Sequence, residues 1–494
     1  MAKVLRIHPA DAVAVALEPL AAGTAIPDFG VVLAADIPQA HKFALRPIAA
    51  GEKVIKYGAP IGIARTAIAA GDHVHTHNLK TGLGDILAYA YADAPPPAAA
   101  PAAAPRIRAF ERANGEIGIR NDLWIIPLVG CVNGLAANLA KRVEAAGILP
   151  EGSRVMVLAH PYGCSQLGDD MANTRAILQD HALHPNAGGV LILGLGCENT
   201  TLEYFREGFA PPDPRRIRYL VSQRVDDEYE AGLAACRELA ATMADDRRVE
   251  TGADRLRIGL KCGGSDGLSG ITANPLLGAF SDWLCGVGGT TVLTEVPEMF
   301  GAERILMARA ETRAVFDKTV ALINDFKAYY IAANQPIYEN PSPGNKDGGI
   351  TTLEEKSLGC TQKAGHAPVR DVLPYGGRIA TPGLNLLSAP GNDGVAITAL
   401  SAAGCHMVLF TTGRGNPLGG VVPAVKVSSN TALATRKPHW IDFDAGPIAS
   451  GAASLDELRD AFVRTVLDVA NGRQTRNEIN GIADLMIFKN GVTL

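Results

Sequence analysis

The sequence predicts an α/β protein in which a parallel sheet flanked by helices follows a small β-rich domain. Apolar residues make up 47% of the chain and glycine contributes 53 of its 494 residues, a composition typical of α/β enzymes with many tight turns. Apolar runs that end in glycine-rich loops alternate with longer amphipathic stretches, as strands buried on both faces of a parallel sheet do. A proline- and alanine-rich segment separates this part from the N-terminal residues.

The N-terminal 93 residues contain short alternating pieces separated by Gly, Pro and Asp turns, namely VLRIH, AVAVAL, HKFAL and KVIKY. Alternation with a period of two is typical of half-buried strands, so we expect residues 1–93 to form the small β domain. Residues 94–105, APPPAAAPAAAP, can bury little surface and are expected to form an extended linker.

After the linker, apolar runs of strand length recur to near the end of the chain. Because they are continuous rather than alternating, we expect them to be strands of a parallel sheet. The runs are residues 123–130, 154–160, 190–196, 217–223, 256–262, 290–296, 384–389 and 406–412.

Charge and hydropathy exclude several classes of partner. The net charge of −5 argues against nucleic acid, since proteins that bind it normally present a basic face to the phosphates. The N-terminus lacks a secretory signal pattern, and no apolar run approaches the roughly 20 residues that span a bilayer. We therefore expect a cytoplasmic protein without membrane contact, whose eight cysteines stay reduced.

Four cysteines are regularly spaced along the predicted strands. Cys131, Cys164 and Cys197 follow one another at steps of 33 residues, and Cys262 lies 65 residues further on. This step matches one strand, helix, strand unit, so the cysteines are expected at the carboxyl ends of successive strands, where α/β sheets bind ligands. The alternative is that they only pack the strand ends, as small apolar residues do.

Three glycine-rich loops carry polar side chains suited to a small acid. In KCGGSDGLSGITANP (261–275), glycines let backbone amides approach a ligand beside Ser265 and Asp266, although the stretch could also be only a turn. NPSPGNKDGG (340–349) and TTGRGNPLGG (411–420) each present one cation, Lys346 or Arg414, that could bind a carboxylate. The alternative for both is a solvated surface loop.

The stretch DHVHTHN (72–78) places His73, His75 and His77 at alternate positions, so on a strand all three face one side. Such a face could bind a metal or reach a substrate from the small domain. It could equally be an exposed polar face near a strand end.

Taken together, long motifs in a fixed order closely resemble the altronate and galactarate dehydratase family. The likeness runs from near residue 4 to the terminal KNGVTL, and HVHTHN and LGCTQKAG resemble the altronate type. The motifs that carry it are HKFALRPIAAGEKVIKYGAPIG, RANGEIGIRN, HPYGCSQLGDD, GLGCEN, CGGSDGLSGITANP, TEVPEMFGAE, NPSPGNKDGGITTLEEKSLGCTQKAG, GLNLLSAPGND and FTTGRGNPLGG.

The resemblance implies a β-clip domain of the SAF kind over 1–93, a dimerising middle region over 106–250 and a Rossmann-like catalytic region over 251–494 that binds no nucleotide. It also implies a homodimer and loss of water from D-altronate to give 2-dehydro-3-deoxy-D-gluconate in hexuronate breakdown. Ferrous iron is the implied cofactor, with manganese as an alternative. Galactarate or another sugar acid is the second substrate hypothesis. The alternative to an enzyme is a sugar-acid binding protein without catalytic activity, in which the cysteines are structural.

Dehydration of a 2,3-dihydroxy acid needs removal of the C2 proton, which a metal on the carboxylate and the 2-hydroxyl would assist. His160, beside Cys164, is the first candidate for the acid or base, with Lys346 and Lys363 as rivals. The side chains proposed to contact the substrate are Ser265, Asp266, Asn345, Arg414, His75 and His77, with Lys346 also suited to its carboxylate.

Two sets of iron ligands are compatible with the sequence. A mononuclear Fe²⁺ would prefer imidazole and carboxylate ligands, drawing on Glu198, Asp266 or the pair His75 and His77. Thiolates that meet at the sheet edge would instead bind iron directly or as an iron–sulfur cluster. Their regular spacing favours a site that includes some of the four cysteines, Cys131, Cys164, Cys197 and Cys262.

Overall fold

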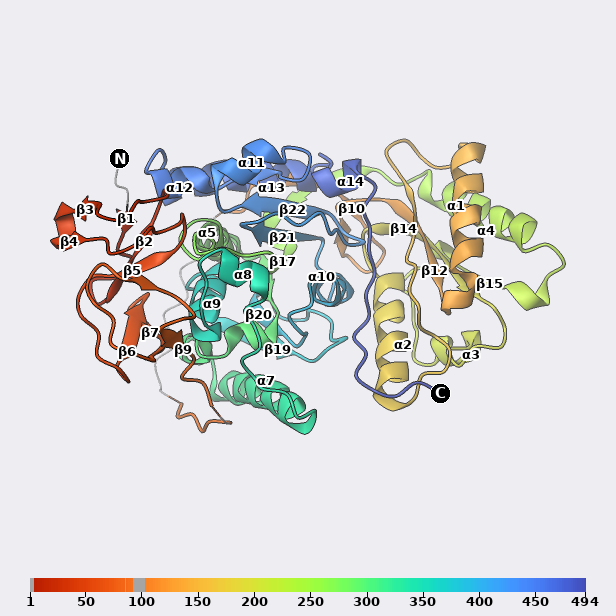
Figure 1. Ribbon diagram of the computed structural model, residues 1–494. Helices are drawn as coiled ribbons and strands as arrows, with labels where there is room; N and C mark the ends of the chain where they lie inside the picture. The colour runs from red at the N-terminus through yellow and green to blue at the C-terminus, as the bar shows by residue number, and fades with distance from the viewer. Residues whose placement is uncertain (1–3, 85, 92–102) are drawn as a thin grey trace.

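The computed structural model describes residues 4–84, 86–91 and 103–494, which form a β-rich N-terminal domain and two parallel sheets with helices on their faces (Figure 1). The predicted α/β fold class is confirmed. Most of the expected linker, residues 94–102, lies outside the described residues.

The N-terminal domain is built from small antiparallel sheets. β1 (Val4–Leu5), β2 (Val13–Ala16), β5 (Lys42–Ala44) and β8 (His73–Val74) form one of them in that order. A second contains β6 (Lys53–Lys56), β7 (Ala59–Ala64) and β9 (Leu79–Lys80), and β3 (Ala25–Ile26) pairs with β4 (Val31–Val32). Buried aliphatic residues such as Val13, Val54 and Ile61 form its core.

The middle domain contains a four-stranded parallel sheet in the order β13 (Val155–Val157), β12 (Asp122–Pro127), β14 (Ala187–Gly194) and β15 (Ile217–Val221). Helices α1 (Asn133–Ala146) and α4 (Glu228–Met243) cover one face, where Leu123 and Ile125 point. Helix α2 (Gly168–Ala182) covers the face of Trp124 and Ile126. Both faces are therefore buried, which explains the continuous apolar runs.

A three-stranded antiparallel sheet joins the two parallel sheets. Its strands are β10 (Arg106–Glu111), β11 (Ile117–Gly118) and β16 (Arg248–Gly252). The face of the middle sheet under α2 shares one apolar core with the C-terminal domain, through residues such as Ile177 and Leu400. The two sheets thus pack through a common hydrophobic layer.

The C-terminal domain contains a seven-stranded parallel sheet. Its order is β19 (Val369–Leu373), β20 (Gly383–Leu387), β18 (Thr290–Leu293), β17 (Arg257–Cys262), β21 (Met407–Thr412), β22 (Ala424–Ser428) and β23 (Phe443–Asp444). Helices α5 (Ala273–Gly286) and α13 (Leu455–Ala470) bury one face, and α10 (Asp393–Ala402) packs on the other. The central strands end at one polar edge.

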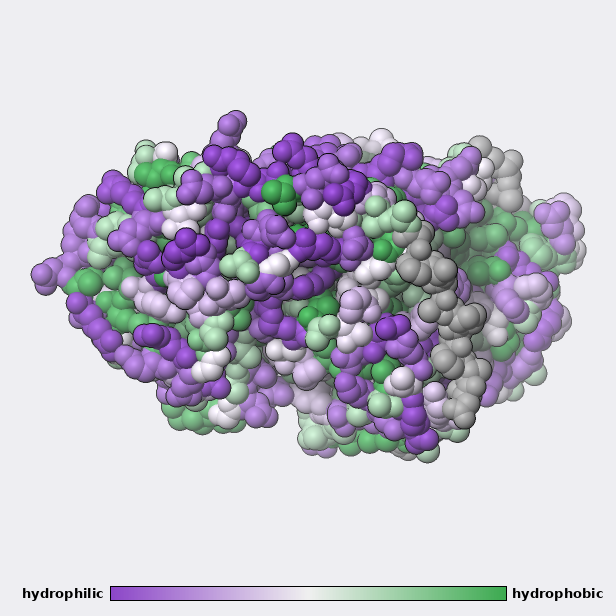
Figure 2. All heavy atoms as spheres, turned by 180° about the vertical axis from the view of Figure 1, so that it is seen from behind, coloured by the Kyte–Doolittle hydropathy of each residue, from purple (hydrophilic) through white to green (hydrophobic). Residues whose placement is uncertain are grey.

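The remaining helices lie around this domain, except α3 (Leu202–Arg206) in the middle domain. They are α6 (Glu303–Met307), α7 (Arg313–Ala332), α8 (Pro343–Asp347), α9 (Leu353–Cys360), α11 (Thr431–Arg436), α12 (Gly446–Ser450) and α14 (Arg476–Ile479). Within the described ranges, no helix has the length and apolar character to cross a membrane. Figure 2 shows that hydrophilic residues cover much of the face opposite to Figure 1, with apolar residues in scattered patches.

All eight predicted strands are present, but they do not form one series. Cys131, Cys164 and Cys197 follow strands of the four-stranded sheet, whereas Cys262 ends β17 of the seven-stranded sheet. The expectation of four cysteines along one sheet edge is therefore wrong for Cys262. The antiparallel strands between the two sheets interrupt the series, and the spacing alone does not reveal them.

A buried ion triad attaches the N-terminal domain to the C-terminal domain. Nζ of Lys42 lies 2.8 Å from Oε2 of Glu355, and Nζ of Lys56 lies 2.7 Å from Oε1 of the same carboxylate. Burial alone would raise the pKa of Glu355, but the two ammonium groups hold it at about 2. One carboxylate of α9 thus forms ion pairs with lysines on two strands of the N-terminal domain, β5 and β6.

We predict that Glu355→Gln destabilises the protein by about 3 kcal/mol, because it leaves two buried ammonium groups without a counter-charge. Urea unfolding followed by circular dichroism measures the loss. Glu52→Gln is the matched control, since Glu52 pairs with Arg46 at an exposed site, where water screens the pair and its loss should have little effect on stability. Equal effects of the two substitutions would contradict this account of the domain contact.

Candidate functional site

The carboxyl ends of the central strands in the seven-stranded sheet form one edge, from which polar loops extend. β17 ends at Cys262, β18 at Leu293 and β21 at Thr412, and each is followed by one of the glycine-rich or acidic stretches of the sequence. In parallel α/β sheets, ligands bind at this edge. The loops at this edge are therefore the candidate ligand-binding region.

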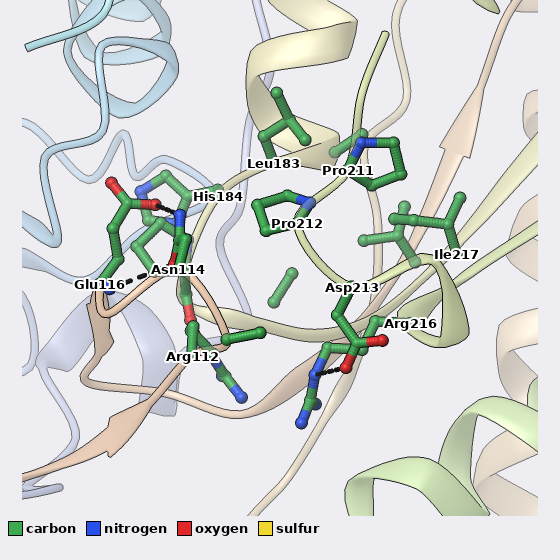
Figure 3. A pocket seen from close by; sticks show the side chains of 15 residues that line it. Arg112, Asn114, Glu116, Leu183, His184, Pro211, Pro212, Asp213, Arg216 and Ile217 are labelled. Carbon is green, nitrogen blue, oxygen red and sulfur yellow. Dashed lines mark hydrogen bonds and ion pairs between the residues drawn. The ribbon is translucent and has the colours of Figure 1, made fainter.

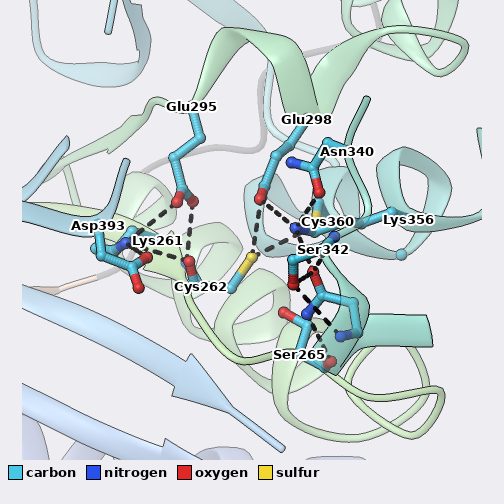
Figure 4. Close-up of polar contacts among 12 residues, drawn as sticks. Lys261, Cys262, Ser265, Glu295, Glu298, Asn340, Ser342, Lys356, Cys360 and Asp393 are labelled. Carbon is cyan, nitrogen blue, oxygen red and sulfur yellow. Dashed lines mark hydrogen bonds and ion pairs between the residues drawn. The ribbon is translucent and has the colours of Figure 1, made fainter. Parts of the chain in front are cut away.

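A group of charges and thiols, which we call the ionic cluster, lies behind these loops (Figure 4). Lys261 Nζ lies 3.1 Å from Glu295 and 2.6 Å from Asp393, and Lys356 Nζ lies 2.8 Å from Glu298. Each of these lysines is buried against a carboxylate, which is the condition under which buried charges are tolerated. The members of the ionic cluster are Lys261, Cys262, Glu295, Glu298, Lys356, Cys360, Lys363 and Asp393.

The thiol of Cys262 is at the centre of the ionic cluster. Its Sγ lies 2.9 Å from Lys363 Nζ, 3.1 Å from Glu298 Oε2 and 3.4 Å from the Sγ of Cys360. Burial would raise the pKa of Glu298, but Lys356 and Lys363 outweigh it and hold the pKa at about 2. Despite burial, Cys262 and Glu295 raise the pKa of Lys363 well above its ordinary value. Glu298 and Lys363 are therefore both charged at neutral pH.

Glu295 holds this arrangement from a left-handed backbone conformation, with φ of +68°. Its carboxylate accepts hydrogen bonds from the Cys262 backbone N–H, at 3.0 Å, and from Lys261 and Lys363. A non-glycine residue in this region is strained, and such strain persists where surrounding contacts fix it, often at functional sites. Here three donors fix the Glu295 carboxylate.

The loop after β17 is ordered by Asp266. Its buried carboxylate accepts from the Ser269 and Ser429 hydroxyls, each at 2.8 Å, and from the Asn430 amide at 3.1 Å. The neighbouring Ser265 hydroxyl is buried and has no hydrogen-bond partner within the described protein. Because a buried hydroxyl without a partner is costly, it is a candidate to bind a ligand.

Asn345 and Lys346 lie on the short helix α8, within the stretch expected to be a loop, and this helix lies beside the loop that carries Arg414. The Asn345 amide donates to the Ser265 carbonyl at 2.9 Å, and a Cβ placed on Gly344 would lie 3.8 Å from Nε of Arg414. Arg414 is exposed and Lys346 half-buried. The structure therefore brings two predicted cations to the mouth of the same loop region.

Four histidines of the N-terminal domain, which we call the histidine group, face this region. His41 Nε2 lies 3.2 Å from the Asp347 carbonyl oxygen, and His75 Nδ1 lies 2.8 Å from Oγ1 of Thr351. The ring centroids of neighbouring members lie 5.1 to 5.7 Å apart. The group consists of His41, His73, His75 and His77.

Burial keeps two of these imidazoles neutral. It lowers the pKa of His73 to about 3, with added repulsion from His41, and that of His75 to about 4, with added repulsion from Lys42. Neutral imidazole is the form that binds a metal or accepts a proton. The histidine group can therefore act on a ligand held by the loops of the other domain.

The remaining predicted residues lie on the middle domain. Cys131, Cys164 and Cys197 are exposed at the edge of the four-stranded sheet. Glu198 accepts hydrogen bonds from the backbone N–H groups of Leu195 and Gly196, at 3.1 and 2.6 Å, so its carboxylate closes its own loop.

His160 is also on the middle domain and has both ring nitrogens engaged by backbone. Nε2 lies 2.8 Å from the Pro127 carbonyl, and Nδ1 accepts from the Tyr162 N–H at 3.2 Å. Burial lowers its pKa to about 4. These contacts fix the loop rather than leave a nitrogen for a substrate.

A hollow in the middle domain is lined by Arg112, His184 and Arg216, among others (Figure 3). Both guanidinium groups are already paired with Asp246, Arg112 at 3.3 Å and Arg216 at 2.7 Å. These cations are neutralised within the protein, so this hollow suits a sugar acid less well than the loops around Arg414.

Comparison with known proteins agrees with this division of the chain. Models of the altronate/galactarate dehydratase SAF domain, of the second domain of D-galactarate dehydratase/altronate hydrolase, and of the D-galactarate/altronate dehydratase C-terminal region match residues 2–82, 109–244 and 253–493. The chain belongs to the altronate and galactarate dehydratase family. Its N-terminal domain is accordingly the SAF domain of that family.

Three relatives match this family member over nearly their whole length. Altronate dehydratase of Escherichia coli (strain K12) is 55% identical over 99% of both chains, and that of Bacillus subtilis (strain 168) is 52% identical over 100% of both. Galactarate dehydratase (L-threo-forming) of Escherichia coli (strain K12) is 33% identical over 95% of this chain and 93% of its own. Similarity is thus greater to the altronate enzymes.

Sequence reasoning missed most of the ionic cluster and one histidine. His41 opens the motif HKFALR, Glu295 and Glu298 lie in TEVPEMFGAE, and Lys356 and Cys360 lie in the stretch LEEKSLGC. These motifs were informative as a family signature, but acidic and basic residues on short helices usually indicate solvated faces. A sign of their role was the presence of several charges inside otherwise apolar or glycine-rich motifs.

We predict that His160→Ala lowers stability by about 2 kcal/mol, because it leaves buried backbone groups without partners. The turnover rate of the folded variant with D-altronate should stay within about threefold of that of the unsubstituted protein, measured as formation of the 2-keto acid and corrected for the fraction of folded protein. His439→Ala, at an exposed position, is the control for stability. A loss of turnover above about 100-fold in folded protein would restore His160 as an acid or base.

Proposed function

We propose that the protein is a hydro-lyase that removes water from D-altronate and forms 2-dehydro-3-deoxy-D-gluconate. The reaction moves the C2 proton to a base and releases the 3-hydroxyl, with one added proton, as water. The resulting enol then tautomerises to the 2-keto acid. The proposal rests on the contact between the histidine group and the segments that carry Lys346 and Arg414. Of the relatives named above, the two most similar are altronate dehydratases.

Binding of the hexonate is assigned to the C-terminal domain. Arg414 and Lys346 are the cations for its carboxylate, because guanidinium and ammonium groups on stiff loops can bind a carboxylate with defined geometry. The unpaired Ser265 hydroxyl and the fixed Asn345 amide lie on adjoining loops and suit the sugar hydroxyls. Recognition of hydroxyls by buried polar groups is what gives strong selectivity between related sugars.

Proton transfer is assigned to the SAF domain. His77 is exposed beside His73, at a ring separation of 5.7 Å, and is the imidazole we assign to accept the C2 proton. Lys363 suits this task less well, because Cys262 and Glu295 stabilise its ammonium form and bury it.

We propose Fe²⁺, or Mn²⁺ in its place, as the cofactor, and two sets of residues are candidates to hold it. Ligand atoms of Cys262, Glu298 and Cys360 all lie within 4.8 Å of one another. These side chains are buried, however, and the Cys262 thiol already contacts Lys363 Nζ. The rings of His41, His73 and His75 lie 5.1 to 5.5 Å apart. Imidazoles that bind one ion at about 2.1 Å have ring centroids about 5 Å apart, so we assign the ion to the histidine group. In this structure the ring nitrogens of His41, His73 and His75 do not all lie within 4.8 Å of one another, so the rings would have to turn toward the ion. Bound there, the metal would polarise the substrate carboxylate and stabilise negative charge after C2 deprotonation.

We also propose that the enzyme works in the cytoplasm as a homodimer. Eight free cysteines, three of them exposed, suit a reducing compartment. The dimer rests on the family resemblance of the middle domain.

The expected substrate profile is dominated by altronate. In an anaerobic screen of hexonates and hexarates with Fe²⁺, altronate should give the highest kcat/KM for 2-keto acid formation. A profile led by galactarate would replace the substrate assignment. Absence of product from every sugar acid under reducing, iron-loaded conditions would contradict the enzyme assignment itself.

The metal assignment predicts opposite results for two substitutions. His75→Ala should weaken Mn²⁺ binding at least about tenfold, because it removes an imidazole ligand, whereas Cys360→Ser should leave binding unchanged. Equilibrium dialysis of the purified full chain measures both without reference to activity. The reverse pattern would assign the ion to the buried thiols.

A further inference from the structure

The three exposed cysteines of the middle domain are placed by one repeated local design. Each is the second residue of a Gly-Cys pair, at 130–131, 163–164 and 196–197. Cys131 follows β12, Cys164 follows β13 and Cys197 follows β14, and these strands are neighbours in the sheet, with β12 in the middle. Parallel strands bring their carboxyl ends to a common edge. The repeated spacing of 33 residues therefore places three thiols together at the edge of one sheet.

Hydrogen bonds join the three cysteine loops to one another. The N–H of Gly130 donates to the Tyr162 carbonyl at 2.9 Å, which ties the Cys131 loop to the Cys164 loop. The Ser165 N–H donates to Oδ1 of Asn199 at 2.7 Å, and the Thr200 N–H donates to the Gly163 carbonyl at 3.0 Å. Every bond lies within three residues of a cysteine, so the loops form one connected surface.

The glycines before the cysteines are required by close packing. A Cβ on Gly130 would lie 3.0 Å from the His160 carbonyl oxygen, and one on Gly163 would overlap the Leu128 carbonyl. Gly163 and Gly196 also have φ values of +98° and +128°, which favour glycine. The backbone at each cysteine is thus held in a fixed position rather than free to move.

Exposure distinguishes these thiols from the other five. Cys131, Cys164 and Cys197 are exposed, whereas Cys236, Cys262, Cys360 and Cys405 are buried and Cys285 is half-buried. Free cysteine is among the most buried residue types, and exposed thiols are open to oxidation. Three exposed thiols on one rigid edge therefore indicate ligand binding better than they indicate packing.

Helix N-termini and polar side chains lie near the three cysteines. Helix α1 begins two residues after Cys131 and α2 begins four residues after Cys164, and helix N-termini stabilise negative charge. The Gln223 amide lies 3.9 Å from the Cys197 Sγ, and the Ser165 hydroxyl lies 3.8 Å from that of Cys164. Hydrogen bonds of this kind tune iron–sulfur centres.

The three thiols do not lie close enough together in this structure to share one ion. Thiolates at about 2.3 Å from a single metal lie about 3.8 Å apart. Among the described residues, the set of three candidate ligand atoms within 4.8 Å of one another is Cys262, Glu298 and Cys360, and the exposed triad does not meet that limit. A cubane cluster holds its thiolates further apart, because each binds a different iron.

We propose that Cys131, Cys164 and Cys197 bind a [4Fe–4S] cluster at the edge of the middle sheet. Glu198 takes no part, since its carboxylate is bound to its own loop, and Cys262 lies on another sheet. The triad supplies three thiolates, so one iron of the cubane has no thiolate from it and can take an oxygen ligand. This site is separate from the histidine group and gives the middle domain a chemical role beyond the proposed function.

The test is anaerobic reconstitution of the full chain with equal amounts of ferrous and ferric iron and with sulfide, which together supply the oxidation level of a [4Fe–4S]²⁺ core. About four acid-labile sulfide and about five iron per chain are expected, the fifth iron being the ion assigned to the histidine group, with the visible absorbance and, after reduction with dithionite, the electron paramagnetic resonance signal of a [4Fe–4S] centre. Cys131→Ser, Cys164→Ser and Cys197→Ser should each lose most of the sulfide and the signal. Cys285→Ser, which changes a thiol outside the triad, should keep both.

Three results would overturn the proposal. They are reconstituted protein without sulfide, zinc binding by the triad that iron and sulfide do not displace, and a cluster that persists in all three serine variants. Circular dichroism of each variant shows whether it folds, and the double variant Cys164→Ala and Cys197→Ala repeats the test if a single serine disturbs a loop. His75→Ala should keep the cluster, which separates this proposal from the assignment of the metal to the histidine group.

Discussion

One buried carboxylate, Glu355, determines how the two halves of the candidate site meet. It sits between Lys42 and Lys56 of the SAF domain, and neither ammonium could stay charged in the interior without it. Lys42 directly follows His41, and its Nζ also contacts the Gly349 carbonyl and the Thr351 hydroxyl. The same attachment therefore brings the histidine group against the loop of Asn345 and Lys346. The proposed substrate-binding side chains of one domain and the imidazoles of the other are brought together by it.

The ionic cluster supports the loops at the carboxyl edge of the seven-stranded sheet and restricts their movement. Lys261, Glu295 and Asp393 alternate in sign, and Glu295 accepts its bonds from a strained backbone position. Paired buried charges resist displacement because separating any pair leaves an uncompensated ion. Polar side chains of an active site need such support to stay within a fraction of an ångström of the productive geometry. The cluster is best understood as this support, with its thiols too enclosed for substrate.

The fold class, all eight expected strands and the polar edge of the C-terminal sheet were predictable, because apolar runs and glycine-rich loops are local signals. The sequence also indicated Arg414, Lys346, His73, His75 and His77 as candidates, whereas His41 was missed. It did not reveal Glu355 or Glu298, because their charge partners lie on distant segments. Equal spacing correctly grouped three cysteines but could not show that Cys262 belongs to a second sheet.

We propose that SAF imidazoles and C-terminal side chains form one active site. A crystal structure of the anaerobic enzyme with Mn²⁺ and altronate, with the ion located by its anomalous signal, tests this most directly. The account predicts the ion among His41, His73 and His75, with the hexonate carboxylate toward Arg414. An ion at Cys262 and Cys360, or a hexonate bound in the middle domain, would contradict it.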